Sequence, residues 1–533
     1  MEADCIHFKE TGYFSKIILD YLSEDKSLAP FYQSSPKISA FKGAIENKKF
    51  SLQQRKVLTE TLKQQYENGK ISLKKTAKVA ENIAALNQEN TFSVTTGHQL
   101  CLFTGPLYFI YKIVSTIKLA NELKKAYPEQ NFVPIYWMAT EDHDFEEINH
   151  FYFKGKRIKW ITDQKGAVGR MKTDGLAIVF EEFKTLLVDY STHTEGLKSL
   201  FEKSYLLHDN LADATRFLVN ELFSAYGVVI IDGDSIALKE QMHGVFEEEL
   251  KQEVSSHLVE QQSEELSKHY KVQVNPREIN LFYLQEGSRK RIVKKDDTYF
   301  INETEQQFSE EEILQKLKDN PECFSPNVLL RPLYQEMILP NLAYIGGGGE
   351  LAYWFQLKST FDHFKTPLPV LLLRNSAMWM DEKQTKYFKQ LDISLKQLFL
   401  DEGVLLKEWV KENAKENLEL TKEKKEAADF YIKLEKKIQK IDGSLHPHLE
   451  ALKTKHQKEL KSLSEKIIRT ERKKQSITTA HINYLKTALF PNRGLQERHD
   501  NFSEIYLSEG KTMIELLLKE FELPAEEFLA IHY

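Results

Sequence analysis

The sequence predicts an α/β protein in which helices cover a parallel sheet and a long helical arm follows. Five short apolar segments of strand length each end in polar or glycine residues, as parallel strands do where ligands bind beyond their carboxyl ends. Beyond about Leu391 the composition shifts towards Lys, Glu and Leu with almost no Gly or Pro, which is typical of long helices. Each strand signal is weak by itself, but five of them favour a sheet with a site along one edge.

Length and composition limit the possible classes of protein. At 533 residues the chain exceeds what one hydrophobic core usually supports, since domains commonly span about 100 to 150 residues, so we expect two or three structural units. The chain is 41% apolar and 29% charged, as ordinary soluble proteins are. Its formal net charge of -6 gives no general electrostatic reason to bind nucleic acid, and we expect no nucleic-acid partner.

The amino-terminal segment and the cysteines indicate the compartment. Residues 1–5 are acidic and lack the basic-then-apolar order of a signal peptide, and no apolar run approaches membrane-spanning length. We therefore expect a cytoplasmic protein with no membrane partner. Cys5, Cys101 and Cys323 offer neither a disulfide framework nor a C-x-x-C zinc spacing, so we interpret them as reduced thiols and expect no structural metal.

Residues 91–147 have the outline of a nucleotide-binding β-α-β unit. An apolar strand ends at His98, and apolar side chains then repeat at helical spacing over residues 107–117. Pro106 suits the first helical position, where its missing N–H costs nothing. Residues 132–138 are apolar on both faces, as expected for a parallel strand covered by helices on each side.

Three more apolar strands and two inserts follow this unit. The strands are expected within residues 226–234, 342–345 and 369–373. Two other stretches alternate apolar and polar residues around turn residues, which predicts antiparallel strands in two inserts of the core, at about 151–203 and 271–325.

The segment after the sheet predicts a coiled-coil hairpin. Two helices with apolar stripes are joined by a turn at Asp442 and Gly443, and Pro447 opens the second helix. Such an arm cannot bury its stripe by itself, so we expect a homodimer. Basic residues gather near the end of the second helix; a solvated face is favoured over a nucleotide or acidic partner. The predicted domains are a helical region packed on the core at 1–90, the core at 91–385, the arm at 386–490 and a segment returning to the core at 491–533.

His98 is the first candidate for chemistry. Gly97 lets the backbone approach a phosphate at a strand-to-helix turn, where the helix N-terminus supplies positive potential. In that place His98 could donate to an α-phosphate during nucleotidyl transfer. A histidine that caps the following turn explains the pattern equally well.

Glu141, Asp142, His143 and Asp144 form the second candidate. Carboxylates beside a histidine can hold a divalent metal, orient the imidazole as a base, or grip a substrate amine. Adjacent residues cannot all converge on one ion, so a mixed amine and Mg-nucleotide site is favoured over a metal cage. Capping of the next helix by Thr140 or Asp142 is compatible with this function.

The third candidate is the glycine loop of residues 346–349 with Glu350. Such a loop after a strand can lie against a ribose or phosphate, with Glu350 reaching a hydroxyl, although a flexible turn is the alternative. Arg374 and Ser376 follow the last strand and could contact phosphates. The full candidate set is His98, Asp142 and His143 for catalysis; Thr96, Gly97, Gln99, Gly346, Gly347, Gly348, Gly349, Glu350, Arg374 and Ser376 for nucleotide binding; and Glu141, Asp144, Arg331 and Gln335 for substrate binding.

Motifs along nearly the whole chain resemble one protein family. They are T-T-G-H-Q with T-G-P-L-Y, the run E-D-H-D-F-E-E-I, R-P-L-Y-Q-E with L-A-Y-I-G-G-G-G-E-L-A-Y-W, and a late L-Q-E-R. In this order they resemble the BshC family of cysteine ligases in bacillithiol biosynthesis. The resemblance implies a Rossmann-like nucleotide-binding core with two connecting-peptide subdomains, similar to class I aminoacyl-tRNA synthetases and nucleotidyltransferases, and an antiparallel coiled-coil arm for dimerisation.

The same resemblance implies a reaction. It is the joining of cysteine to the amine of glucosaminyl malate, with ATP and Mg²⁺, as the last step towards bacillithiol. Thr95 stands where the related superfamily has the first histidine of its H-x-G-H signature, and Arg374-Asn375-Ser376 stands at the place of its K-M-S-K-S loop. Two other functions stay open: a non-catalytic nucleotide-binding scaffold or sensor, and a metal-dependent hydrolase that uses residues 141–144.

Overall fold

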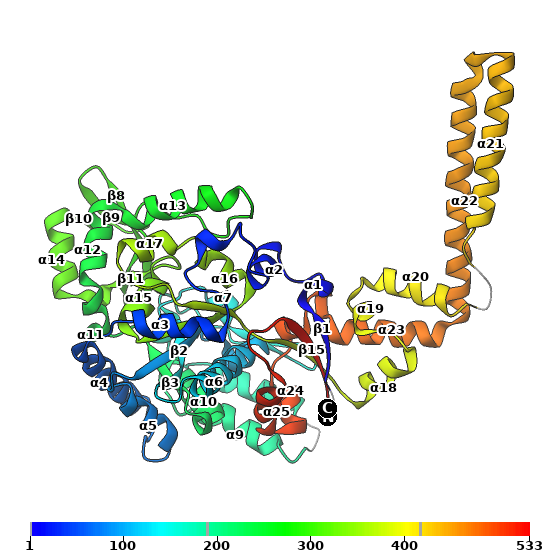
Figure 1. Cartoon of the computed structure of the whole chain (residues 1–533). Coiled ribbons are helices and arrows are strands. Elements are labelled where there is room, and N and C mark those ends of the chain that lie inside the picture. Colours follow the sequence, from blue (N-terminus) through cyan, green and yellow to red (C-terminus); the bar gives the residue numbers. More distant parts are fainter. Residues whose placement is uncertain (1–2, 188–190, 415–417) are drawn as a thin grey trace. The chain divides into compact units, whose positions relative to one another are not determined.

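The computed structural model describes residues 3–187, 191–414 and 418–533, and the chain divides into two compact units (Figure 1). The sheet unit comprises residues 7–377 and 496–529, and the arm unit comprises residues up to 6, 378–495 and 530–533. Every residue that lines the candidate site belongs to the sheet unit.

A five-stranded parallel sheet forms the core of the sheet unit. Its strand order is β13-β12-β2-β3-β6, and each neighbouring pair is parallel. The strands are β2 (Thr91–His98), β3 (Asn131–Met138), β6 (Val229–Asp232), β12 (Asn341–Gly346) and β13 (Val370–Leu373). They fall in the five predicted apolar segments, so the prediction of a parallel sheet is confirmed. All five carboxyl ends therefore lie along one edge.

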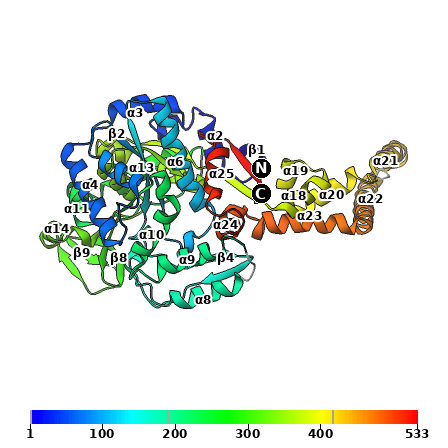
Figure 2. The same cartoon turned by 90° about the horizontal axis from the view of Figure 1, so that it is seen from below.

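Helix α6 (Tyr108–Ala126) connects β2 to β3 and packs against both strands (Figures 1 and 2). The sequence had indicated Pro106 as the first residue of this helix. The helix begins after Leu107, so Pro106 lies just before it. Burial of apolar side chains drives this packing. The buried cluster between the sheet and its helices includes Phe41, Phe92, Val94, Leu119, Leu123, Ile345 and Leu372.

Several helices begin where the sequence supplies a cap. The Ser51 hydroxyl accepts a hydrogen bond from the Gln54 backbone and the Gln54 side chain accepts one from the Ser51 backbone, which is a capping box at α4. Ser309 and Glu312 form another at α14. Besides α6, the helices of the sheet unit are α1 (Phe8–Thr11), α2 (Lys16–Leu22), α3 (Phe41–Asn47), α4 (Leu52–Asn68), α5 (Ala77–Ala85), α7 (Phe145–Ile148), α8 (Leu176–Leu186), α9 (Thr194–Tyr205), α10 (Leu211–Phe223), α11 (Ile236–Lys239), α12 (His243–Gln252), α13 (Val254–Ser267), α14 (Glu310–Asp319), α15 (Arg331–Ile338), α16 (Gly348–Trp354), α17 (Lys358–His363), α24 (Ser503–Glu509) and α25 (Thr512–Glu520).

Two antiparallel patches interrupt the parallel sheet in sequence, as the alternating pattern predicted. The first is the hairpin of β4 (His150–Phe153) and β5 (Lys156–Lys159). The second is a five-stranded sheet in the order β10-β9-β8-β7-β11. Its strands are β7 (Leu281–Gln285), β8 (Ser288–Lys295), β9 (Thr298–Ile301), β10 (Gln307–Ser309) and β11 (Phe324–Pro326).

Helices α1 to α5 lie within the predicted helical region of residues 1–90, but the first described residues form a strand. Strand β1 (Ala3–His7) pairs with β15 (Glu527–His532), which also pairs with β14 (Ser376–Met380). The chain passes from one unit to the other within each of these strands, and once more after Leu495. The pattern of residues 1–90 could not reveal β1, because its partner strand lies at the opposite end of the chain.

The arm unit is helical. Helices α21 (Thr421–Ile441) and α22 (His446–Lys474) are joined by a turn at Gly443–Leu445, and Pro447 lies in the first turn of α22 as predicted. Its other helices are α18 (Glu382–Leu391), α19 (Leu395–Phe399), α20 (Glu402–Glu412) and α23 (Ser476–Leu489).

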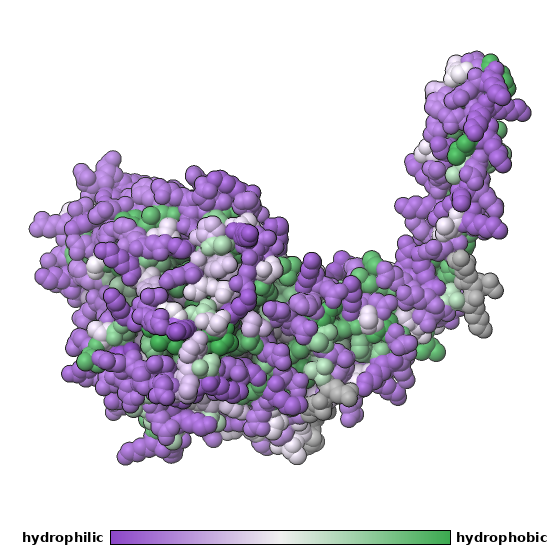
Figure 3. All heavy atoms as spheres, viewed as in Figure 1, coloured by the Kyte–Doolittle hydropathy of each residue, from purple (hydrophilic) through white to green (hydrophobic). Residues whose placement is uncertain are grey.

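Apolar side chains remain on the surface of the arm, where Figure 3 shows hydrophobic patches among polar residues. Phe430 and Ile441 are 55% and 70% exposed, and Leu463 is 49% exposed. The homodimer expected from this pattern stays a prediction. Within the described residues, no helix is both long and apolar enough to cross a membrane.

Replacing Ile345 with alanine should lower the free energy of unfolding by about 2–5 kcal/mol, because the side chain is fully buried in the sheet core and its loss leaves a cavity. Ile178→Ala removes the same group from a site that is 76% exposed, and should change the free energy by less than about 0.5 kcal/mol. Urea denaturation followed by circular dichroism measures both. Equal losses would contradict this assignment of the core.

Candidate active site

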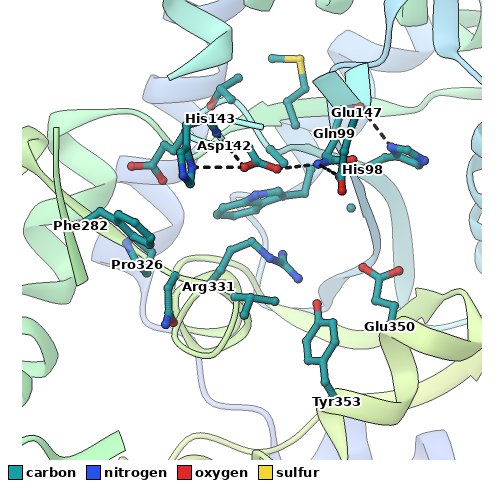
Figure 4. Close-up of a pocket in the computed structure, with 18 of the residues that line it drawn as sticks. His98, Gln99, Asp142, His143, Glu147, Phe282, Pro326, Arg331, Glu350 and Tyr353 are labelled. Atoms are coloured by element: carbon teal, nitrogen blue, oxygen red, sulfur yellow. Dashed lines mark hydrogen bonds and ion pairs between the residues drawn. The ribbon is translucent and has the colours of Figure 1, made fainter. Parts of the chain in front are cut away.

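A cavity of about 710 Å³ opens at the carboxyl ends of β2 and β3. Its walls also include residues of α6, the second insert, α15, α16 and the carboxyl-terminal segment. Figure 4 shows His143, Phe282 and Pro326 at one end and Glu350 and Tyr353 at the other, with the Arg331 side chain between them. The cavity therefore has an end formed by the second insert and an end formed by the sheet and its helices.

Most of the predicted site residues line this cavity. They are Gly97, His98, Gln99, Glu141, Asp142, His143, Arg331, Gly347, Gly349, Glu350 and Arg374. Six others lie outside the lining: Thr96, Asp144, Gln335, Gly346, Gly348 and Ser376.

The structure explains several of these outside positions. The Thr96 hydroxyl donates to the Ile345 carbonyl inside the sheet, at 2.7 Å. Gln335 is fully buried and accepts a hydrogen bond from Arg331, and the Ser376 hydroxyl accepts one from Arg374. These two residues position cavity arginines. Asp144 is exposed beside the start of α7.

His98 presents an unprotonated nitrogen. Its Nδ1 lies 3.2 Å from the Gln99 carbonyl oxygen, so the hydrogen of a neutral imidazole belongs on Nδ1. Burial, with the nearby Lys112 charge, lowers the pKa of His98 to about 3, which keeps the ring neutral. Nε2 is buried without a hydrogen-bond partner among the described residues. In this state Nε2 accepts a hydrogen bond and does not donate one to a phosphate.

His143 has the opposite tautomer. The Arg289 guanidinium donates to its Nδ1 at 3.0 Å, so the ring hydrogen belongs on Nε2. Burial and the Arg289 charge lower the pKa of His143, which keeps the ring neutral. His143 is therefore a hydrogen-bond donor through Nε2, whereas His98 is an acceptor.

Two carboxylates share one amide near these histidines. The Gln99 side-chain nitrogen donates to Asp142 at 2.7 Å and to Glu147 at 2.8 Å, and both carboxylates line the cavity (Figure 4). Neither forms an ion pair with a lysine or arginine among the described residues, so together they can hold a cationic amine. Glu141 differs, because buried Lys239 lies 2.6 Å from its carboxylate. Glu147 was absent from the predicted set.

A buried ion pair joins α6 to α16 beside His98. The Lys112 ammonium donates to the Gly97 carbonyl at 2.5 Å and to Glu350 at 2.6 Å, and the Tyr344 hydroxyl donates to the other oxygen of Glu350. Burial raises the pKa of Glu350, but the Lys112 charge, the hydrogen bonds from Lys112 and Tyr344 and the Arg331 charge together outweigh it, so the net pKa is lowered and the carboxylate stays ionised. Each carboxylate oxygen thus accepts a hydrogen bond, and these bonds hold Glu350 in the cavity floor. The predicted contact of Glu350 with a ribose hydroxyl stays a prediction.

Arg374 keeps one donor free. Its Nη2 lies 2.7 Å from the Glu497 carboxylate, and its Nη1 donates to the Asn375 carbonyl and the Ser376 hydroxyl. Nε is buried with no hydrogen-bond partner among the described residues, and it faces Gly347, where an added Cβ would lie 3.9 Å away. The guanidinium lies 5.1 Å from the ring centre of Tyr108, which stacks on His98.

The cavity is cationic although the chain is acidic. Seven basic side chains line it: Lys112, Arg277, Arg289, Arg291, Arg331, Arg374 and Arg498. Only Glu141, Asp142, Glu147 and Glu350 oppose them there. The sequence alone did not single out Lys112 and the insert arginines, because a lone basic residue in a helix or strand carries no local signal. Arg498 lies in the L-Q-E-R motif, and that motif is a local signal.

The residues present fit a phosphate-bearing ligand better than a protein-held metal. The buried Nε–H of Arg374 is a donor without a partner among the described residues, and the surrounding charge is positive. Among the residues that the structure covers, no group of three or more His, Cys, Asp or Glu side chains could hold a metal ion.

Comparison with known proteins gives the family. Residues 1–375 match "Bacillithiol biosynthesis BshC, N-terminal Rossmann-like domain", and residues 377–533 match "Bacillithiol biosynthesis BshC, C-terminal coiled-coil domain". The chain belongs to the BshC family. Membership confirms the Rossmann-like core and the coiled-coil arm that the resemblance implied.

Relatives in the BshC family are similar over their full length. A protein of Flavobacterium psychrophilum named "Putative cysteine ligase BshC" is 48% identical over 100% of both chains. One of Flavobacterium johnsoniae with the same name is 46% identical over 98% of both chains. A more distant one of Staphylococcus haemolyticus is 28% identical over 93% of this chain and 94% of its own.

In this BshC family member, Lys112→Met should lower the free energy of unfolding by about 3–5 kcal/mol, because it leaves the Glu350 carboxylate buried without its cation. The double variant Lys112→Met/Glu350→Gln removes the unpaired charge and should recover most of that loss. Urea titration of the two variants and the wild type measures the coupling. Additive losses would show that the two groups do not depend on each other.

His98 should make this BshC chain less stable in acid. The unfolded chain binds a proton at histidine below about pH 6.5, whereas the folded chain does so only near pH 3, so acidification through this window favours unfolding. His98→Gln lacks that group and should lose less stability than the wild type between about pH 6.5 and pH 4. Thermal unfolding across this range tests it. Parallel curves would contradict the lowered pKa.

Proposed function

We propose that this protein is an ATP-dependent ligase that joins the cysteine carboxylate to the glucosamine amine of glucosaminyl malate, which completes bacillithiol. The names of its relatives support cysteine ligase chemistry. A carboxylate is a poor acyl donor, so ATP must first convert it to an adenylate, with loss of pyrophosphate, or to an acyl phosphate, with loss of ADP. The amine then attacks the acyl carbon, the amide forms, and AMP or phosphate leaves.

The charge distribution of the cavity is the observation that carries this proposal. The reactants together bear phosphates, three carboxylates and amines. The cavity offers an excess of basic side chains for the anions. It offers the Asp142 and Glu147 pair for a cationic amine, held by the Gln99 amide. A site of this kind suits joining an anionic amino sugar to an activated acid.

The geometry suggests a role for each group. Arg374, with its free Nε, and Arg498 would bind phosphate near Tyr108. Mg²⁺ would accompany the nucleotide and neutralise phosphate charge. Asp142 or Glu147 would hold the substrate ammonium group and take its proton before attack. His98 would accept a hydrogen bond through Nε2, and His143 would donate one through its own Nε2.

We also propose that the protein is a cytoplasmic homodimer formed through the arm. The exposed apolar side chains of α21 and α22 support a second copy there, since neither helix can bury them alone.

Purified protein with ATP, Mg²⁺, cysteine and glucosaminyl malate should produce bacillithiol, detected by mass spectrometry. Glu147→Gln should lower kcat by about 10²-fold or more, because it removes a carboxylate that holds the amine. Glu146→Gln is the matched control: its carboxylate is exposed, outside the cavity and paired with Lys159, so activity should stay within about twofold. No product under any redox or nucleotide condition would overturn the proposal.

A further inference from the structure

The second insert presents arginines to the cavity from one strand and one loop. Arg289 and Arg291 lie two residues apart on β8, so their side chains leave the same face of the sheet. Arg291 is the register partner of Phe282 on β7, and both line the cavity. Arg277 joins them from the loop that precedes β7. One wall of the cavity is therefore cationic.

Arg289 has a structural task in this wall. Its guanidinium stacks on Phe282, with 3.9 Å between the guanidinium carbon and the ring centre. It donates to the Ser325 hydroxyl, to the Pro326 carbonyl at 3.0 Å and to His143. Its donors are thus largely used by neutral protein groups.

Arg277 and Arg291 differ from Arg289. Neither guanidinium forms an ion pair or a side-chain hydrogen bond with another described residue, although both line the cavity. Lys290, between the two β8 arginines, leaves the opposite face, pairs with Glu303 and does not line the cavity. Two guanidinium groups with available donors therefore face the same space.

The loop that carries Arg277 is held by a buried polar network. The Arg277 backbone N–H donates to the Asn280 side chain at 3.1 Å, and Asn327 donates to the same oxygen at 2.8 Å. Asn280 in turn donates to the fully buried Glu249 carboxylate, which also accepts from Ser255. Because each buried group has a partner, the position of this loop is well defined.

The insert arginines lie away from the proposed phosphate-binding residues. Phe282, the partner of Arg291, lies at one end of the cavity in Figure 4, and Glu350 lies at the other. Arg374 lies over Tyr108 beside His98, at the end formed by the sheet. The cavity can thus bind two anionic groups at once, one at each end.

We propose that Arg277 and Arg291 form a subsite for a short dicarboxylate, which in the proposed reaction is the malate group of glucosaminyl malate. A guanidinium binds a carboxylate with two parallel hydrogen bonds, so two arginines match two carboxylates. The identity of the whole substrate rests on the proposed function, but recognition of a dicarboxylate does not. The subsite selects the acceptor sugar by its acidic aglycone.

Calorimetric titration of the full chain with L-malate alone tests this subsite without turnover. Wild-type protein should bind malate and succinate, and bind the monocarboxylate lactate at least tenfold more weakly. Arg277→Gln and Arg291→Gln should each weaken malate binding at least tenfold. Lys290→Gln, on the same strand but outside the cavity, should bind malate as the wild type does.

Four results would overturn the proposal. The first is that the wild type does not bind malate at 10 mM, and the second is that both arginine variants bind malate as tightly as the wild type. The third is that Lys290→Gln weakens malate binding as much as the arginine variants do. The fourth is that Arg498→Gln weakens malate binding while the two insert variants do not. If the ligase activity is also shown, Arg291→Gln should raise KM for glucosaminyl malate at least tenfold and leave KM for methyl glucosaminide unchanged. Malate binding without ligase activity would support the subsite and count against the proposed function alone.

Discussion

The buried ion pair between Lys112 and Glu350 constrains the floor of the cavity. Removing charges from water costs several kcal/mol per ion unless each finds a close partner, so α6 and α16 must begin where the two groups can meet. The Lys112 ammonium also donates to the carbonyl of Gly97 at the end of β2, so its position is fixed from two sides. An added Cβ at Gly97 would lie 3.0 Å from the Tyr344 hydroxyl, which bonds to the same carboxylate. Two helices and a strand end are thereby held together around His98.

Electrostatics then divide the cavity into parts with different chemistry. Burial and the Lys112 charge keep His98 neutral, and burial and the Arg289 charge do the same for His143, yet the two rings expose opposite hydrogen-bonding character at Nε2. The carboxylates of Asp142 and Glu147 share one amide, and cationic groups occupy both ends of the cavity. This arrangement binds anions at two places while it retains one acidic position for an amine.

Distant segments complete this arrangement. Glu497 comes from the carboxyl-terminal segment and holds the guanidinium of Arg374, which follows β13. The second insert supplies Arg277, Arg289 and Arg291, and it is anchored through buried Glu249 on α12. The site therefore depends on the return of the chain end and on an insert, neither of which belongs to the parallel sheet itself.

The sequence alone determined the five parallel strands, the antiparallel inserts and the helical arm, because hydrophobic periodicity and turn residues act over neighbouring positions. It also located His98, Asp142 and Arg374, since polar residues after parallel strands meet at one edge. Only the tertiary structure decided that the Thr96 hydroxyl donates to a carbonyl inside the sheet, that Lys112 holds Glu350, and that the insert arginines face the cavity. Such convergence depends on contacts between segments far apart in the chain, and no local pattern encodes it.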